Sequence, residues 1–133
     1  MSNSVIPLIR EQMKIANQTE DNITVLINCE LKIAGFLFRL NEEVRDALRE
    51  KLSAYNERKE KDAQHILTGE GTLGKKEAEA IVNNKAERDR ELETEVAYVY
   101  IKGGVGATEE YLKALSQRIA HLRKEWEQKA KNV

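Results

Sequence analysis

Residues 23–40 read ITVLINCELKIAGFLFRL and form the densest apolar run of this 133-residue chain. On a helical wheel their apolar side chains lie on nearly all sides, so a helix built from them needs neighbours in several directions. The main stripe has steps of three, four or seven residues and comprises Ile23, Leu26, Cys29, Ile33, Leu37, Leu40, Val44, Leu48 and Tyr55. A second apolar face, confined to the run, comprises Ile27, Leu31, Ala34 and Phe38. We therefore predict a long helix from residue 23 whose second face contacts another copy of the chain.

The composition indicates long helices and no bulk attraction to nucleic acid or membrane. Charged residues make up 34% of the chain and there is one proline, a balance typical of helices rather than sheet sandwiches. The formal net charge of −1 excludes a strong overall field. The first ten residues lack the features of a signal peptide, and Glu30, Lys32 and Arg39 make residues 23–40 unsuited to crossing a bilayer. We expect a soluble, cytoplasmic protein.

The segment before the central run predicts a short helix. Ile6, Ile9, Met13 and Ala16 recur at helical spacing, and Pro7 suits a first helical turn. Either Thr19 or Asn22 can then cap the start of the next helix.

Beyond Leu40 the chain becomes strongly charged. Residues 41–62 contain thirteen charged side chains among twenty-two, with only a narrow apolar stripe, so this part of the helix is expected to face mostly water. Three glycines between His65 and Gly74 predict a turn. The next charged helix is predicted over residues 75–95. Its expected packing stripe comprises Ala78, Ile81, Lys85, Leu92 and Val96.

The last part of the chain holds one ambiguous and one clear element. Residues 96–101 (VAYVYI) suit either a strand or a continued helix, and the glycines of residues 102–106 are expected to end it. Thr108 is expected to cap a final helix, with Glu109 in its first turn. The apolar seam of that helix comprises Leu112, Leu115, Ile119, Leu122 and Trp126.

These elements predict an all-α fold. If the turn near Gly71 reverses the chain, a long antiparallel helical hairpin results, with coiled-coil-like packing. Residues 5–40 and 96–126 would form a compact helical head, and residues 41–95 a projecting arm of one domain. Broad hydrophobicity of the head and thin stripes in the arm favour a homodimer.

Two glycine-rich segments have phosphate-loop spacing. Residues 69–76 (GEGTLGKK) match G-x-x-x-x-G-K but place Lys76 where a magnesium-binding Ser or Thr is needed. Residues 102–108 (KGGVGAT) resemble the deviant Walker A loop, KGGVGKT, of the ParA and MinD ATPase family. The resemblance implies a nucleotide-binding loop, but Ala107 replaces the lysine that neutralises the phosphates. Both segments are therefore interpreted as connectors between helices, and no cofactor is expected.

No catalytic or metal-binding pattern is found. His65 and His121 are far apart in sequence, and His121 with Glu125 supplies only two ligands. Cys29 lies among apolar residues, where a thiol usually serves as a small core side chain. The protein is expected to be non-enzymatic.

The function expected is that of a protein–protein interaction, assembly or regulatory adaptor, a kind common among phage and mobile-element products. Ile66, Leu67 and Leu73, near the tip of the arm, are the expected contacts for a protein partner. The alternative is a nucleic-acid-binding helical dimer that uses the basic C-terminal helix. The residues expected to contact phosphates are Lys113, Arg118, Lys124 and Lys131.

Overall fold

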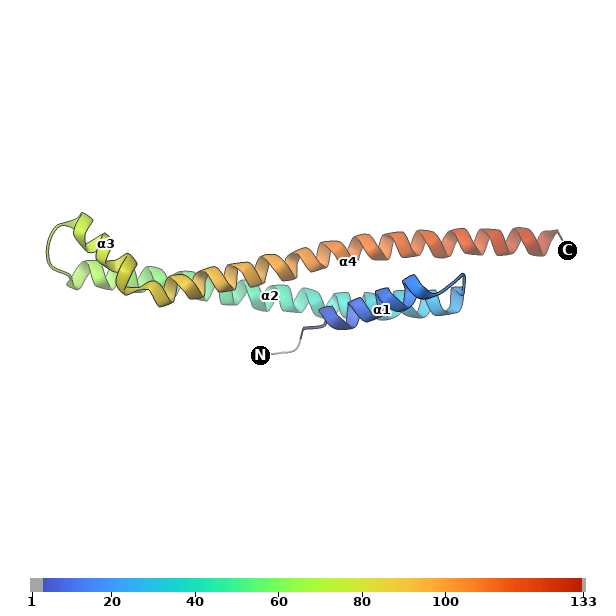
Figure 1. The fold of residues 1–133 in the computed structure, drawn as a ribbon, viewed down its shortest axis with the longest axis horizontal. Helices are drawn as coiled ribbons and strands as arrows, with labels where there is room; N and C mark the ends of the chain where they lie inside the picture. Colours follow the sequence, from blue (N-terminus) through green and yellow to red (C-terminus); the bar gives the residue numbers. More distant parts are fainter. Residues whose placement is uncertain (1–3, 133) are drawn as a thin grey trace. The chain divides into compact units, whose positions relative to one another are not determined.

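The computed structural model describes residues 4–132, which form four α-helices and short connections (Figure 1). The helices are α1 (Ile6–Gln18), α2 (Ile23–Thr68), α3 (Leu73–Asn83) and α4 (Lys85–Lys131). The described range contains no strand, so residues 96–101 are helical and the all-α prediction is confirmed. The chain divides into two compact units: unit 1 comprises Met1–Glu43 and Lys102–Val133, and unit 2 comprises Val44–Ile101. α2 and α4 contribute to both units.

Unit 1 contains the main apolar core. Leu26, Ile33 and Leu40 of α2 are fully buried and lie seven residues apart, which keeps them on one side of the helix. The other core residues are Val5, Ile9 and Ala16 from the α1 region, Cys29 from α2, and Leu115, Ile119 and Leu122 from α4. The predicted stripes around residues 9–16, 26–40 and 115–122 are therefore confirmed. Trp126 is the exception in the predicted C-terminal seam, because 70% of its surface is exposed.

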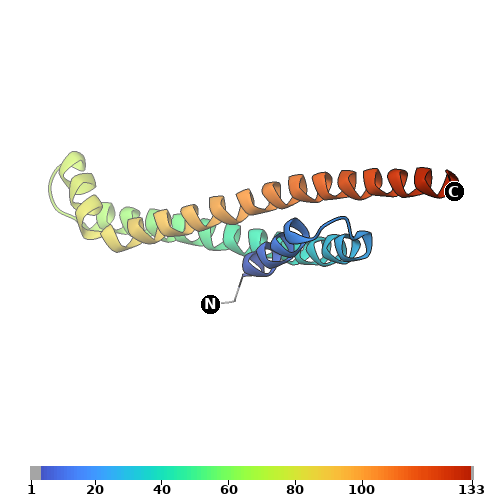
Figure 2. The ribbon, with the colours of Figure 1, turned by 45° about the vertical axis from the view of Figure 1, so that its right-hand side comes forward.

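α1 lies beside the start of α2 in both views of the ribbon (Figures 1 and 2) and is held by polar contacts from α4. The guanidinium of Arg118 donates from Nη1 to the Ala16 carbonyl oxygen (3.1 Å) and from Nη2 to the Thr19 carbonyl oxygen (2.8 Å). These carbonyls lie at the C-terminal end of α1, where the helix itself supplies no donors. The Tyr111 hydroxyl donates to Asn17 Oδ1 (2.8 Å) and lies 3.2 Å from the Met13 carbonyl oxygen. α4 therefore caps α1 as well as packing on it.

Asn22, the last residue of the α1–α2 connection, caps the N-terminus of α2. Its Oδ1 accepts from the Val25 amide (3.2 Å), so Asn22 rather than Thr19 supplies the side-chain cap of α2. Pro7 occupies the first turn of α1, as predicted.

The packed side of unit 2 differs from the prediction. Ala47, Ala54 and Ala80 are buried there, with at most 9% of their surface exposed. Of the expected stripe, Ala78 is exposed, and Ile81, Leu92 and Val96 are 56–61% exposed. Leu48 and Tyr55 of α2 are also more than a third exposed. The prediction failed because it followed the largest apolar residues, whereas small alanines let two helices approach closely.

Residues 102–108 are also different from the prediction. The glycines do not end a helix, and Thr108 is not a cap: the segment lies inside α4, where the Thr108 hydroxyl donates to the Gly104 carbonyl oxygen (2.7 Å). A Cβ on Gly104 would lie 3.5 Å from Ile6 and 3.8 Å from Leu40, which are ordinary van der Waals contacts, so Gly104 faces the core of unit 1. Packing on both sides of the segment outweighs the helix-propensity cost of about 1 kcal/mol per glycine. The helix break falls instead at Asn84, between α3 and α4.

The predicted turn after α2 is confirmed, and it occupies residues 69–72. Gly71 has a φ of +104°, a conformation that favours glycine. The Thr72 hydroxyl accepts from the Lys75 amide (3.3 Å) and caps α3.

The contact between Arg118 and α1 gives a first prediction. We expect Arg118→Ala to speed amide hydrogen exchange in the last turn of α1 about tenfold, equivalent to ~1.4 kcal/mol, because two charge-assisted hydrogen bonds are lost. Arg123→Ala, at an exposed position of the same helix, is the control and should leave that exchange unchanged. Equal exchange rates in the two variants would contradict the capping role.

Candidate interaction surfaces

The described residues contain no group of three or more His, Cys, Asp and Glu side chains placed to hold a metal ion. None of their helices is long and apolar enough to span a bilayer.

The α2 outer face, defined as Ile27, Leu31, Ala34 and Phe38, is exposed in unit 1. Leu31 and Phe38 are 65% and 71% exposed, Ala34 is exposed and Ile27 is half-buried. A Cβ on the neighbouring Gly35 would meet nothing within 4 Å. The structure thus places the four predicted interface residues on one helix face. Leu31, Ala34 and Phe38 are left exposed by the described part of unit 1, and Ile27 lies half-buried at the edge.

The three predicted tip residues of unit 2 flank the α2–α3 turn. Leu67, near the end of α2, is 83% exposed, and Leu73, at the start of α3, is 60% exposed. Ile66 is half-buried. Two of these three side chains are therefore available to a partner without any rearrangement.

The basic residues predicted to contact nucleic acid do not act as one group. Lys113, Lys124 and Lys131 are exposed and lie along one side of α4, since they are eleven and seven residues apart. Arg118 is separated from this ridge, because its guanidinium donates to the carbonyls of α1. The structure leaves a three-lysine ridge on α4.

Neither glycine-rich segment forms a phosphate loop. Residues 102–108 lie within α4, where backbone amides donate to carbonyls of the preceding turn and cannot surround a phosphate. Residues 69–76 form a turn and the first residues of α3. The likeness to the ParA and MinD loop is thus confined to sequence.

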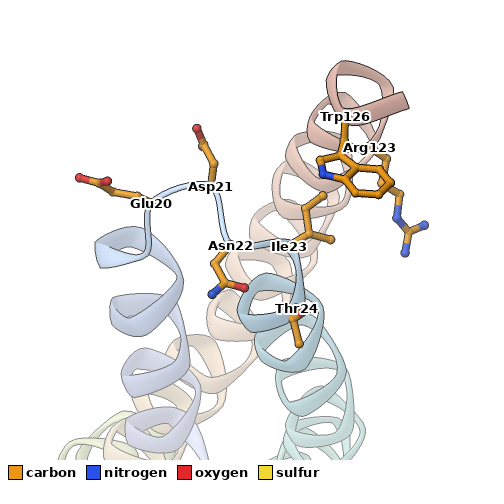
Figure 3. A pocket seen from close by; sticks show the side chains of 7 residues that line it. All are labelled: Glu20, Asp21, Asn22, Ile23, Thr24, Arg123 and Trp126. Atoms are coloured by element: carbon orange, nitrogen blue, oxygen red, sulfur yellow. The ribbon is translucent and has the colours of Figure 1, made fainter. Parts of the chain in front are cut away.

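A hollow of about 800 Å³ lies beside the α1–α2 connection in unit 1 (Figure 3). Its lining residues are Glu20, Asp21, Asn22, Ile23, Thr24, Arg123 and Trp126. The Ile23 side chain points toward the Trp126 indole, whereas Glu20 and Asp21 point away from it (Figure 3). Sequence reasoning missed this hollow because it placed Trp126 in a packed seam. The arrangement offers an open apolar contact to a partner side chain, with carboxylates at its edge.

A polar network joins α2 to the α3–α4 break in unit 2. Asp62 accepts from Asn84 Nδ2 (3.0 Å), from Arg88 Nη2 (3.0 Å) and from Arg58 Nη1 (3.2 Å). Arg58 Nε also donates to Glu91 Oε2 (2.6 Å). Asn84 follows the last residue of α3, so its bond to Asp62 fixes the position of the helix break. This network is structural and explains how a unit with few large core residues keeps its alignment.

The network changes the acidity of its members. Burial opposes ionisation of Asp62, but hydrogen bonds from Asn84, Arg88 and Arg58 outweigh it, so the Asp62 pKa lies below its ordinary value. The hydrogen bond with Glu91 raises the pKa of Arg58. Elsewhere, burial raises the pKa of the Cys29 thiol, consistent with a core side chain rather than a nucleophile.

The sequence matches no protein-family model, and neither a curated protein nor a solved structure shows significant similarity to it.

The lowered Asp62 pKa gives a prediction of pH dependence. The ionised network stabilises unit 2 above the unfolded-state pKa of Asp, about 3.9, and this contribution is lost as the pH falls through the lower folded-state value. We expect Asp62→Asn to destabilise unit 2 at pH 7. Because the variant has no carboxylate to protonate at this position, it should lose less stability than the wild type as the pH falls below about 4. The measurement is thermal unfolding followed by circular dichroism. Asp46→Asn, at an exposed position of the same helix, should behave as the wild type.

Proposed function

We propose that this protein is a non-enzymatic assembly protein that binds a second copy through the α2 outer face and a protein partner through the tip of unit 2. The observation that carries the proposal is the exposure of Leu31 (65%) and Phe38 (71%) on the helix that also holds the main core. Contiguous exposed apolar side chains are typical of protein interfaces. We place this function in the cytoplasm, as a single buried thiol suits a reducing compartment.

The α2 outer face suits an isologous contact between two helices. The centre of this face carries only small residues, Ala34 and Gly35. Leu31 lies three residues before Ala34, and Phe38 lies four residues after it. Small residues at the centre let two backbones approach, and larger ones beside them fill the space between the helices. A two-fold axis near Ala34 would set each Leu31 close to the partner's Phe38 in an antiparallel crossing.

The proposed architecture is a long antiparallel helical hairpin with coiled-coil-like packing, present as a homodimer. It is supported by antiparallel contacts between α2 and α4 inside unit 2, such as Arg58 with Glu91 and Lys51 with Tyr98. The later residue of α2, Arg58, meets the earlier residue of α4, Glu91, as an antiparallel arrangement requires. In this architecture the exposed Leu67 and Leu73 form a terminal apolar contact for the protein partner.

The dimer contact can be tested by cross-linking. In a chain whose buried thiol is removed by Cys29→Ala, we expect Ala34→Cys to form a disulfide-linked dimer under mild oxidation, because residue 34 lies at the proposed axis. The covalent dimer is measured by non-reducing gel electrophoresis and mass spectrometry.

Two variants make this test specific. Lys32→Cys, exposed on a different side of α2, should cross-link much more slowly. Adding Phe38→Glu to Ala34→Cys should suppress the cross-link about tenfold or more, since a charge would be placed inside an apolar contact. Equal cross-linking at positions 32 and 34 would contradict the proposed interface.

The second candidate function is nucleic-acid binding by Lys113, Lys124 and Lys131, favoured by their common exposed side of α4. Under this function the affinity for labelled duplex DNA falls with added salt, with a log–log slope of about −1 per phosphate contact. Changing all three lysines to Glu would abolish binding, whereas Lys14→Glu with Lys32→Glu, at exposed positions elsewhere, would reduce it less. Undiminished binding by the triple variant, measured by fluorescence anisotropy, would exclude the ridge.

A further inference from the structure

Unit 2 carries a second apolar surface, contributed by two helices. The unit 2 face is defined as Leu48, Leu52 and Tyr55 of α2 with Leu92, Val96 and Val99 of α4. These six side chains are 37%, 51%, 38%, 61%, 60% and 61% exposed, in that order. Their three- and four-residue spacing places each set along one side of its helix. Three alanines of this unit, Ala47, Ala54 and Ala80, are in contrast buried.

The two sets lie on the same side of unit 2. A hollow of about 210 Å³ between the helices is lined by Lys51, Leu52 and Tyr55 from α2 and by Glu91 and Glu95 from α4. Leu92 and Val99 are neighbours of Glu95 on the α4 surface, at three- and four-residue steps. The α4 wall of the hollow is formed by Glu91 and Glu95, and the apolar residues of α4 lie beyond Glu95 on the same side of the unit.

Charges on this face are divided between the helices. The α2 half carries the exposed Arg45 and Lys59, and Lys51 at the edge of the hollow. The ammonium groups of Lys51 and Lys59 lie 5.0 Å from the ring centres of Tyr98 and Tyr55, respectively.

The α4 half carries the exposed Asp89 and Glu95, and the exposed Lys85 lies at its end, seven residues before Leu92. Glu91, also at the hollow, is paired with Arg58. One half of the face is thus mainly basic and the other mainly acidic, and both flank apolar side chains.

We propose that the unit 2 face binds the same face of a second copy, with α2 of each copy opposite α4 of the other. A two-fold axis parallel to the helices produces this pairing and brings basic and acidic halves together at both contacts. An axis perpendicular to the helices would instead set α2 on α2 and α4 on α4, opposing like charges. The product is a bundle of four helical segments, in which Leu48, Leu52, Tyr55, Leu92, Val96 and Val99 form a shared core.

The inference rests on the proposed assembly function but uses a different surface. Within one copy, two helices packed through alanines supply little apolar burial, because an alanine methyl removes less apolar area from water than a Leu or Val side chain does. Pairing of two unit 2 faces would bury the larger side chains that each copy leaves in water.

The test uses the full chain carrying Phe38→Glu, so that the α2 outer face is disabled and only the unit 2 face can associate. The dissociation constant is measured by sedimentation equilibrium. Two charge-reversed forms are compared: Asp89→Lys with Glu95→Lys, and Arg45→Glu with Lys59→Glu. A third form carries all four changes and has the same net charge as the Phe38→Glu parent, since the two sets of changes cancel.

We expect the Phe38→Glu chain to dimerise, each two-residue reversal to weaken the dimer at least about tenfold, and the four-residue reversal to restore it to within about threefold. Glu60→Lys with Glu77→Lys, exposed and outside the face, alters the net charge equally and should have little effect. Val96→Asn, which removes apolar area without adding charge, should weaken the dimer as well. Circular dichroism verifies that each variant is folded.

Two results would overturn the inference: a monomeric Phe38→Glu chain, or a four-residue reversal as weak as either half alone. The first result, with an associated wild-type chain, would leave the proposed α2 outer face intact. The opposite pattern, in which Phe38→Glu leaves the wild-type dimer unchanged while the charge reversals act, supports the unit 2 face and counts against the α2 outer face.

Discussion

The structure depends on a seven-residue spacing of buried positions along α2. Leu26, Ile33, Leu40, Ala47 and Ala54 follow one another at this interval, and each is at most 9% exposed. Because seven residues make nearly two helical turns, one side of a 46-residue helix stays in contact with its neighbours over most of its length. The residues at these positions are large up to Leu40 and small from Ala47 onward. The two units are therefore stabilised in different ways.

In unit 1 the large side chains of this series require more than one neighbour, and α1 and α4 both cover them. In unit 2 the alanines bring α2 close to α3 and α4, and specificity comes from Asp62, which receives hydrogen bonds from three side chains. An alignment that separated Asp62 from these donors would leave a half-buried carboxylate unpaired, which is costly. Apolar burial therefore dominates unit 1, while polar pairing sets the alignment of unit 2.

The sequence was most informative where large apolar residues are the buried ones. The helices around Ile9, Leu26–Leu40 and Leu115–Leu122 follow from spacing alone. Over residues 78–96 the spacing of the apolar residues did not predict the buried face, because Ala80 packs inward while Leu92 and Val96 remain exposed. Gly103 and Gly104 were expected to end a helix, but local propensity was overridden by packing of α4 on either side. The hollow at Trp126 could not be anticipated, since it depends on where the α1–α2 connection meets α4.

In unit 2 the buried apolar side chains are alanines and larger apolar side chains are exposed. This arrangement is the basis for proposing self-association. A monomer gains most when its largest apolar side chains are buried, yet Leu31, Phe38, Leu92 and Val96 are each at least 60% exposed while alanines occupy the contacts of unit 2. Exposed leucines spread at random would require no explanation, but these recur at helical steps on defined faces. Exposed apolar faces of this kind lower the solubility of an isolated chain and do not stabilise it. In the proposed assembly, a second copy of the chain covers these side chains with a surface of complementary charge.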